Sequence, residues 1–361
     1  MKKLEWYILK QLLLTFLTCM LIFTVIAVAV DSSEKTDDFV NSGLTTSQII
    51  KQYYIGFVPY IWGMLYPLFV FIAVIYFTSK MAMRSEIIAI FATGTTYNRW
   101  LRIYLVGGLF FAAVLWVATA FWIPKANDLR ATFQARYIDN PSAAEVQRGS
   151  SVYLRTDSNT YIGMRYYDTS GKMGNNFFLN RLKGRELVFN LRADMIAWDT
   201  AQRKWKLTNV VERTVGPRGE VMQERPEQFI NLNLQPADLR HDNYLKDKLT
   251  TPDLERYIKA EELRGNEGVN TLKVEKYRRT ATCVSVLIMT LIGAVLAGRK
   301  TRGGSGVHLA LGIIIAAVFI MFDRFSTVFS VKGNLHPFIA AWIPNVIFSF
   351  VAIYLYRKAP K

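Results

Sequence analysis

The sequence lacks the residue sets that most enzymes and metal proteins need. It has only two cysteines in 361 residues, Cys19 and Cys283, and both fall inside apolar runs. Two such thiols exclude a disulfide framework and have no metal-ligand spacing. The three histidines, His241, His308 and His336, are far apart and have no cysteine beside them. No G-x4-G-K-[ST], H-E-x-x-H or G-x-S-x-G pattern occurs, so we expect a chain without its own nucleotide, metalloprotease or serine hydrolase site.

Long apolar runs are abundant instead. A bilayer core of ~30 Å needs roughly 20 apolar residues in a helix, and 51% of this chain is hydrophobic. Pro59 and Pro67 predict a kink in the second run, and Pro124 is expected to close the third. A short amphipathic stretch, 45–54, precedes the second run. The runs predict six transmembrane helices, at 7–30, 55–78, 103–123, 280–297, 307–322 and 337–356.

Charge in the short loops predicts the orientation of these helices. With the amino terminus in the cytoplasm, the inside segments carry thirteen basic residues against Glu5 and Glu86. The short outside loops carry four basic and five acidic residues. This is the positive-inside pattern, and it explains most of the net charge of +16 without nucleic acid. The inside basic residues are Lys2, Lys3, Lys10, Lys80, Arg84, Arg99, Arg102, Arg299, Lys300, Arg302, Arg357, Lys358 and Lys361.

About 150 polar residues separate the third run from the fourth and contain no candidate span. Six short pieces rich in Val, Ile, Tyr, Phe and Trp predict strands there, separated by turns such as Thr169-Ser170-Gly171-Lys172. We therefore expect a β sandwich, jelly roll or open barrel outside the membrane. Thr251-Pro252 predicts the N-cap and first position of a helix that runs to about Arg264. The expected strands are 151–156, 160–167, 176–182, 186–190, 193–199 and 204–213.

The segment 84–94 is too short to span and lies on the predicted cytoplasmic side. Ser85 and Glu86 begin a helix, Ile87 and Ile90 share one of its faces, and Gly94 ends it. Such a helix docks into a groove on a soluble partner or lies on the bilayer surface. The residues alone leave both interpretations open.

Three stretches together carry a family resemblance. Arg84-Ser85-Glu86 through Gly94 looks like an S-E-[ILV]-x-A-x-x-A-x-G coupling helix. Residues 272–302, with Glu275, Arg278, Arg279 and an Arg299-Lys300-Thr301-Arg302 loop, frame the fourth run. Residues 333–345 match G-x-L-x-P…A-W-[IL]-P-N, including Asn334 and Pro344. In this order the chain resembles the LptF/LptG (YjgP/YjgQ) permease family of the lipopolysaccharide exporter.

The resemblance implies a fold and a division into parts. It predicts a polytopic α-helical membrane protein with six transmembrane helices, three before and three after an inserted periplasmic β-jelly-roll-like domain. The predicted parts are 1–124 with a coupling helix near 84–94, 125–270, and 271–361. Tyr277, the segment 281–283 and Val28 differ from residues common in the family, so the choice between the two paralogues stays open.

The resemblance also implies partners and sites. The expected partners in the bacterial inner membrane are a homologous permease subunit, a cytoplasmic ATPase dimer that uses the ATP, a periplasmic jelly-roll bridge protein and lipopolysaccharide. This chain itself would hold no cofactor or metal. Spans one and five would form the lateral gate. Arg84, Ser85, Glu86, Ile87, Ile90 and Gly94 would couple to the ATPase, and Lys35 would be the nearest basic residue for lipid phosphates. The residues themselves add four candidate lipid contacts: Asp323 and Arg324 at the end of the fifth run, and Tyr161 and Trp198 in the aromatic-rich strands.

Two other functions remain to be weighed. A mechanotransmission subunit would relay the ATPase cycle to an outside partner without carrying lipid. A membrane-bound enzyme acting on envelope polymers would need a nucleophile and base or a metal set, and no such motif is visible in the sequence. Asp323 and Arg324, at the end of the fifth run, could pair there as a structural feature or take part in a lipid path, and the residues alone leave both interpretations open.

Overall fold

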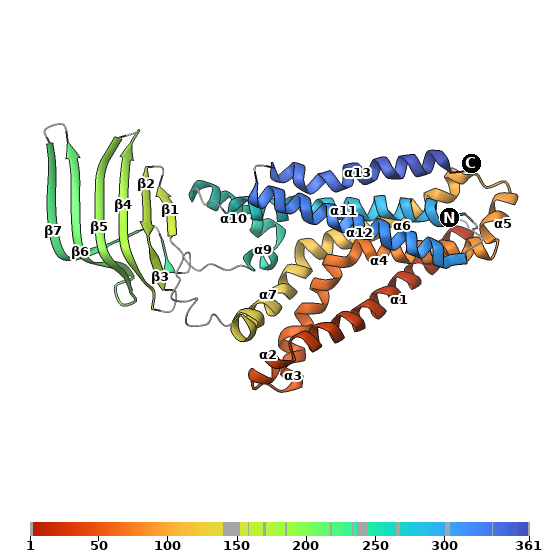
Figure 1. Ribbon diagram of the computed structural model, residues 1–361, viewed down its shortest axis with the longest axis horizontal. Coiled ribbons are helices and arrows are strands. Elements are labelled where there is room, and N and C mark those ends of the chain that lie inside the picture. Colours follow the sequence, from red (N-terminus) through yellow and green to blue (C-terminus); the bar gives the residue numbers. More distant parts are fainter. Residues whose placement is uncertain are drawn as a thin grey trace. The chain divides into compact units, whose positions relative to one another are not determined.

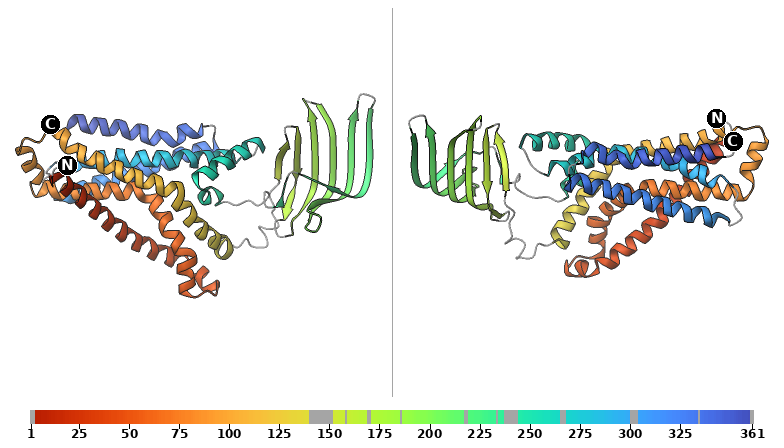
Figure 2. Two further views of the ribbon diagram at one scale, coloured as in Figure 1. Left: turned by 180° about the vertical axis from the view of Figure 1, so that it is seen from behind. Right: turned by 45° about the horizontal axis from the view of Figure 1, so that its top comes forward.

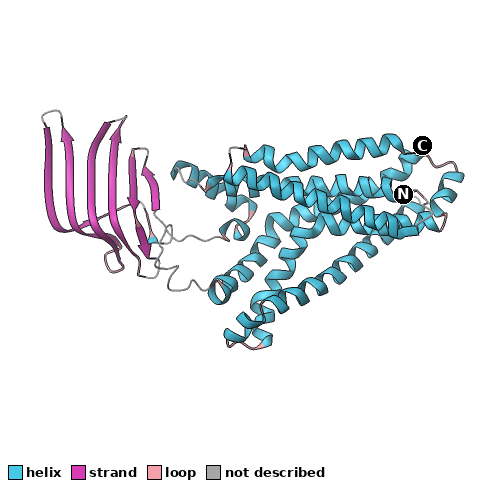
Figure 3. Cartoon of the chain, viewed as in Figure 1, coloured by secondary structure: helices cyan, strands magenta, loops and turns pink. Residues whose placement is uncertain are grey.

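The structure is a computed structural model, and it describes residues 3–139, 152–157, 159–168, 171–184, 186–216, 219–232, 234–236, 244–264, 268–299, 304–333 and 335–359. Several predicted features lie outside these ranges: Lys2, Ser151, Thr169, Ser170, His241, Lys300, Thr301, Arg302, Asn334 and Lys361. The chain divides into two compact units. The helical unit comprises 1–138, 246–255 and 270–361, and the β unit comprises 139–245 and 256–269. Figure 3 shows this segregation of helices and strands.

Six helical segments within the described residues are long and apolar enough to cross a membrane, three before and three after the strands. This confirms the predicted architecture. The first is α1 (Lys3–Glu34); the second joins α3 (Thr46–Ile49), a π-helical turn and α4 (Ile55–Met83). The third joins α6 (Tyr97–Val117), π-helical turns and α7 (Ile123–Phe133). The last three are α11 (Val269–Ala297), α12 (Gly304–Lys332) and α13 (Pro337–Lys358).

The third span is longer than the sequence predicted, because Pro124 does not end it. A π-helical turn at Ala118–Trp122 precedes the proline, which then occupies the first turn of α7. Proline lacks an N–H and its ring clashes with the carbonyl four residues earlier, so it is tolerated where a helix restarts. The helical path therefore continues to Ile138.

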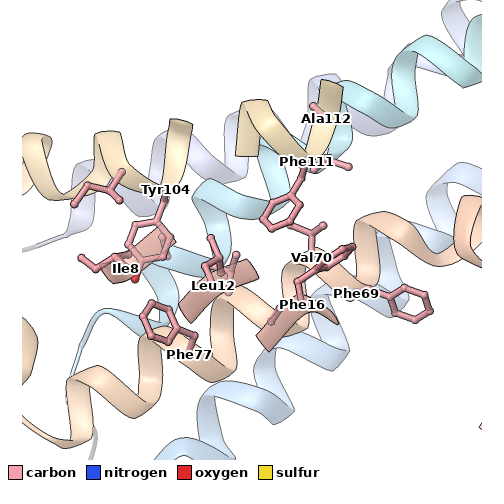
Figure 4. Close-up of a cluster of buried hydrophobic side chains, with 14 of the residues drawn as sticks. Ile8, Leu12, Phe16, Phe69, Val70, Phe77, Tyr104, Phe111 and Ala112 are labelled. Atoms are coloured by element: carbon pink, nitrogen blue, oxygen red, sulfur yellow. The ribbon is translucent and has the colours of Figure 1, made fainter. Parts of the chain in front are cut away.

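The first three spans share one apolar core. Ile8, Leu12 and Phe16 recur every four residues on α1 and are the side chains that bury it against α4 and α6. Figure 4 shows Phe16 beside Val70 and Phe111. The rings of Phe16 and Phe111 lie 4.7 Å apart, centroid to centroid. Most of the remaining apolar surface of α1 is exposed in this chain.

The last three spans pack on the opposite side of α4. Phe71 and Ile75 of α4 join Met289, Ile292 and Phe319 in a second core cluster. Close approach is possible because Gly293 has no Cβ: a methyl group at this position would lie 3.0 Å from Cγ1 of Val74. The helix α4 is thus the centre of the unit and is its most buried long helix in the first half of the chain.

A proline also creates a polar contact between α12 and α13. Pro344 has no N–H, so it cannot bond the carbonyl of Ala340 within α13. The Ser326 hydroxyl of α12 donates a 2.5 Å hydrogen bond to that buried carbonyl. On the other side of α13, Asn345 donates to the Ala281 carbonyl of α11 at 2.7 Å. Both contacts fix α13 against its neighbours.

Short helices connect these spans. They are α2 (Thr36–Asn41), α5 (Glu86–Ala92), α9 (Leu245–Lys248) and α10 (Thr251–Arg264). The predicted N-cap of α10 was wrong by one residue. Thr250 caps the helix: its Oγ1 accepts from the Asp253 N–H at 3.4 Å and donates to the Asp253 carboxylate at 2.5 Å.

The described part of the β unit contains a seven-stranded antiparallel sheet. Figure 1 shows its strands side by side. Its order is β1-β2-β4-β5-β6-β7, with β3 also paired to β4. The predicted pieces 186–190 and 193–199 form one continuous strand, and 160–167 splits into two. The strands are β1 (Val152–Asp157), β2 (Thr160–Met164), β3 (Tyr166–Asp168), β4 (Met173–Lys183), β5 (Glu186–Asp199), β6 (Lys204–Gly216) and β7 (Gly219–Ile230).

One face of the sheet is apolar across four strands and the edge strand is not. Ile162 pairs Leu179, which pairs Leu191, and all three are buried. Strand β7 is nearly fully exposed, and we did not predict it because it carries charges and Pro226. An edge strand tolerates both, since its outer N–H groups need no partner in the ladder.

Candidate functional site

The short helix α5 lies at the end of the helical unit where both chain termini lie. Figures 1 and 2 show this grouping from three directions. The Tyr356 hydroxyl of α13 donates to Asn98 Oδ1 at the start of α6, 2.7 Å away, and so ties the two helices together there. The predicted orientation assigns this end to the cytoplasm.

The structure changes the role of the predicted docking face of α5. Ile87 and Ile90 are only 2% and 7% exposed and pack in the chain's own core with Trp100. They anchor α5 and are not available to a partner. The exposed face carries Ile88, at 58% exposure, which sequence reasoning missed. A helix of only seven residues is too short for its apolar pattern to show which isoleucines face the core. Tertiary packing decides that Ile87 and Ile90 are buried and Ile88 is exposed.

Polar residues begin α5 in a strained conformation. Ser85 has φ +61°, a left-handed conformation that non-glycine residues rarely adopt. Ser85 lies between the end of α4 at Met83 and the start of α5 at Glu86, so the backbone must turn sharply there. Arg84 and Glu86 flank it with a 3.8 Å separation between guanidinium nitrogen and carboxylate oxygen. Gly94, at φ +80°, closes the segment and leaves open space around it.

Lys35 lies within a buried cluster at the opposite end of the helical unit. Its ammonium contacts the Asp31 carboxylate at 2.7 Å and the Tyr53 hydroxyl. It also lies 4.7 Å from the Tyr53 ring centroid, and its side chain is only 18% exposed. Tyr53 donates to the same Asp31 oxygen at 3.0 Å. Lys35 is therefore held by its own chain, and a lipid phosphate would have to compete with Asp31 for it.

A larger charged network joins α9, α11 and α12 at this end. The sequence suggested that Asp323 could pair with Arg324. In the structure the Asp323 carboxylate instead lies 3.5 Å from Nε of Arg278. Arg278 also lies 3.8 Å from Glu275. Arg279 contacts Glu275 at 3.4 Å and donates to the Lys246 carbonyl at 2.9 Å. The network fixes the positions of the Arg278 and Arg279 side chains close to one another.

Two adjoining cavities lie beside this network. The outer one is bordered by α4, the third span, α9, α11 and α12, and the inner one by α4 and the last three spans. The outer one, of about 170 Å³, contains four basic and two acidic side chains: Lys246, Arg278, Arg279 and Arg324 against Asp247 and Glu275. The inner one, of about 70 Å³, is mainly apolar, with Leu65, Leu68, Met289, Phe319 and Ile320 in its wall. Both are lined by Gly63, Met64, Arg278, Thr282 and Arg324, so they form one crevice.

Buried polar atoms make the outer part of this crevice electrostatically unusual. Asn127 lines it and is 5% exposed, and its Oδ1 has no hydrogen-bond partner among the described residues. Its amide donates to the Asp247 carbonyl at 3.2 Å. Burial raises the pKa of the Asp247 carboxyl, and repulsion from Glu275 adds to the shift. The surroundings of Asp247 therefore disfavour the negative charge of its carboxylate.

The other predicted lipid residues belong to the β unit. Tyr161 is exposed on the sheet face opposite Ile162, under the Arg155 guanidinium at 5.6 Å. Trp198 is half-buried against Trp205, with ring centroids 5.1 Å apart. Among the predicted residues, only Asp323 and Arg324 line the crevice. Arg278 and Arg279 were noted as motif residues, but nothing in the sequence indicated that Lys246 would join them.

Comparison with known proteins places the whole chain in one family. Residues 6–358 match the family described as lipopolysaccharide export system permease LptF/LptG. No curated protein matches the chain. The match covers all six spans and the sheet between them. The chain is therefore a multi-pass membrane protein that belongs to the LptF/LptG family of lipopolysaccharide export permeases.

Proposed function

We propose that this chain is the permease subunit of an ABC-type lipopolysaccharide exporter. It extracts lipopolysaccharide from the inner membrane and passes it to a periplasmic bridge, and a separate cytoplasmic ATPase drives the step. The observation that carries the proposal is the crevice with a basic outer part and an apolar inner part. In this proposal the β unit lies in the periplasm.

The crevice suits the ligand chemically. Lipopolysaccharide is a phosphorylated sugar lipid, and arginine binds phosphate through paired, charge-assisted hydrogen bonds. Arg324 lines the crevice and is exposed, so an incoming phosphate can reach it. The apolar wall below offers surface to an acyl chain. The basic side chains and the apolar wall both belong to the helical unit, so this unit alone forms the crevice.

The extraction must be driven from elsewhere. Each methylene moved from lipid into water costs about 0.8 kcal/mol, so a single twelve-carbon chain costs about 10 kcal/mol. The sequence has no phosphate-binding loop that would supply this energy. The exposed face of α5, with Glu86 and Ile88, is the proposed contact for the ATPase.

A second, homologous permease is the proposed neighbour in the membrane. Of the six spans in the described residues, α1 and α12 have the smallest buried share of their apolar stretches, at 11% and 17%. Their exposed apolar side chains include Leu21 and Phe329. These two faces supply the surface for a partner and for a lateral gate between the subunits.

Charge reversal at α5 tests the coupling. In proteoliposomes with the ATPase and partner permease, Glu86→Lys should lower ATPase co-purification and ATP-dependent lipopolysaccharide release by about 10-fold, the size of one lost charged contact. Glu186→Lys, an exposed reversal at the start of β5, is the matched control. Intact coupling in the α5 variant would contradict the proposal. Coupling without any lipid cross-link to the crevice would favour a mechanotransmission subunit instead.

A further inference from the structure

A cavity at the end of the helical unit where both chain termini lie has no part in the proposed function. It measures about 590 Å³ and lies between the start of α1 and the first three turns of α6. Just beyond it, at Gly107, the two helices come into contact: a Cβ there would lie 3.1 Å from Cδ2 of Leu9 and 3.2 Å from Cδ2 of Leu12. The lining residues are Glu5, Thr96, Asn98, Arg99, Arg102, Ile103 and Val106.

Two arginines on successive turns of α6 give the lining an excess of positive charge. Arg99 and Arg102 are both exposed and form no ion pair with any residue that the structure describes. Glu5 is the one acidic residue among the described residues that line the cavity. Arg99 also lies in the first turn of α6, where the helix dipole disfavours a cation. The charge in this cavity is therefore not balanced by the described part of the chain.

The neutral side chains of the lining add hydrogen-bond donors beside the arginines. The Tyr356 hydroxyl donates to Oδ1 of Asn98 at 2.7 Å, which uses the acceptor of this amide and leaves its nitrogen as a donor. The Thr96 hydroxyl lines the cavity and makes no capping hydrogen bond to α6. Guanidinium, amide and hydroxyl groups are the donors that hold the oxygens of a phosphate.

The same face of α6 becomes apolar directly after the arginines. Residues three and four apart share a helix face, and Val106 follows Arg102 by four. From Val106 to the end of α6 at Val117 the helix rises about 17 Å, which is close to the half-thickness of about 15 Å of a bilayer core. The exposed apolar residues that continue this face are Leu109, Ala113 and Val117.

We propose that this cavity binds the headgroup of an anionic phospholipid, whose acyl chain lies along the apolar face of α6. The volume is within the range of small-molecule sites. The predicted orientation assigns this end to the cytoplasm, and the cytoplasmic leaflet is the one whose anionic lipids attract basic pockets between helices. The crevice of the proposed function lies at the opposite end of the helical unit, so this lipid is a resident of the other leaflet and not the transported molecule.

Charge and apolar length together favour a lipid over other anions. A free phosphate would use the arginines alone and gain nothing from the apolar face that starts at Val106. Acidic side chains of a soluble partner would pair with Arg99 and Arg102 but would not extend along a helix inside the membrane. A phospholipid carries a phosphate at one end and an apolar chain of the required length at the other, so one molecule accounts for both parts of the face.

Native mass spectrometry of the full chain with its partner subunits, in detergent, tests the inference. The probes are dioleoyl phosphatidylglycerol, which is anionic, and dioleoyl phosphatidylcholine, which has no net charge. The parent complex should prefer phosphatidylglycerol by about 30-fold, the effect of two arginines beside one headgroup. The double variant Arg99→Gln, Arg102→Gln should lose this preference, and Arg99→Lys, Arg102→Lys should keep most of it because the charge remains.

A second double variant controls for the general surface charge. Arg357→Gln, Lys358→Gln removes two exposed basic residues at the same end of the helical unit, and neither residue lines the cavity. It should change phosphatidylglycerol binding by less than about 5-fold. Inorganic phosphate and lipopolysaccharide should both fail to displace the bound phospholipid. Equal thermal midpoints show that the variants are folded.

Four results would overturn the inference. Equal weakening by the two double variants would mean that only the general surface charge attracts the lipid. Displacement by inorganic phosphate would assign the cavity to a free anion, and displacement by lipopolysaccharide would assign it to the transport path. Unchanged phosphatidylglycerol binding in Arg99→Gln, Arg102→Gln, together with loss of ATPase co-purification, would assign the arginines to a protein contact.

Discussion

Removal of the Arg279 side chain should release α9 from the helical unit. Arg279 is buried, at 8% exposure. Its guanidinium contacts one group on each of three helices: α9, α10 and its own helix, α11. It donates to the Lys246 carbonyl at 2.9 Å and to the Thr251 hydroxyl at 3.1 Å, and it pairs with Glu275 at 3.4 Å. The first two contacts connect α11 to α9 and to the start of α10.

The magnitude follows from what Arg279→Met leaves behind. Breaking a buried ion pair by removing one partner costs about 3–5 kcal/mol when the other charge is stranded. Here Glu275 keeps Arg278, 3.8 Å away, so we expect the lower end, about 3 kcal/mol. The Lys246 carbonyl and the Thr251 hydroxyl lose their donor, and these losses are local to residues 246–251.

Hydrogen exchange followed by mass spectrometry measures this directly. Local opening that becomes about 3 kcal/mol easier should speed exchange of the backbone amides around α9 by about 100-fold, while the amides of α4 stay protected. Lys276→Met is the matched control. Its ion pair with Glu255 is short, at 2.7 Å, but partly exposed, and should change exchange by less than about 5-fold. Unchanged exchange at 246–251 in Arg279→Met would refute the reasoning.

Three further predictions concern the helical unit. Ser85→Gly should raise the free energy of unfolding by about 1 kcal/mol and Ser85→Val should lower it by about 1 kcal/mol, because φ +61° favours glycine; equal thermal midpoints for the two variants would count against strain at this turn. Gly56→Ala should destabilise the unit by about 2 kcal/mol or more, since its Cβ would clash with the Ala126 carbonyl oxygen, and Gly306→Ala, with open space around it, is the control in the same melt. The raised pKa of the Asp247 carboxyl means that folding favours its protonated form. Its contribution to the free energy of unfolding is therefore fully present below the unfolded pKa of about 3.9 and is lost as the pH rises through the raised folded pKa. Asp247→Asn should flatten this pH dependence of amide exchange in α9, and an identical pH profile in the variant would contradict the assignment.

The sequence predicted the spans well because the bilayer imposes a simple rule. A segment that crosses it must be long, apolar and helical, since unpaired backbone groups are too costly there. The runs 7–30 and 337–356 therefore correspond to α1 and α13 with only small changes at their ends. Pro124 misled the prediction because a local rule about proline was applied without the π-helical turn before it.

The strands show which elements an apolar–polar alternation in the sequence can predict and which it cannot. Pieces with alternating apolar residues were found, because one face of β4, β5 and β6 is buried. Strand β7 has exposed residues on both faces and Pro226 within it, so neither alternation nor propensity marks it. Its existence depends on the ladder that β6 offers, which is a long-range hydrogen-bonding partner and not a property of the segment.

The sequence by itself determined the number of spans, the inserted β region and the family, because hydrophobic length and short motifs are local properties. Only the tertiary structure decided which isoleucines of α5 face inward and that Asp323 pairs with Arg278 and not with its neighbour. It also decided that Lys246 joins the Arg278 and Arg279 network. The physical reason is that burial and ion pairing depend on distances between helices that are far apart in the chain, and no local pattern encodes them.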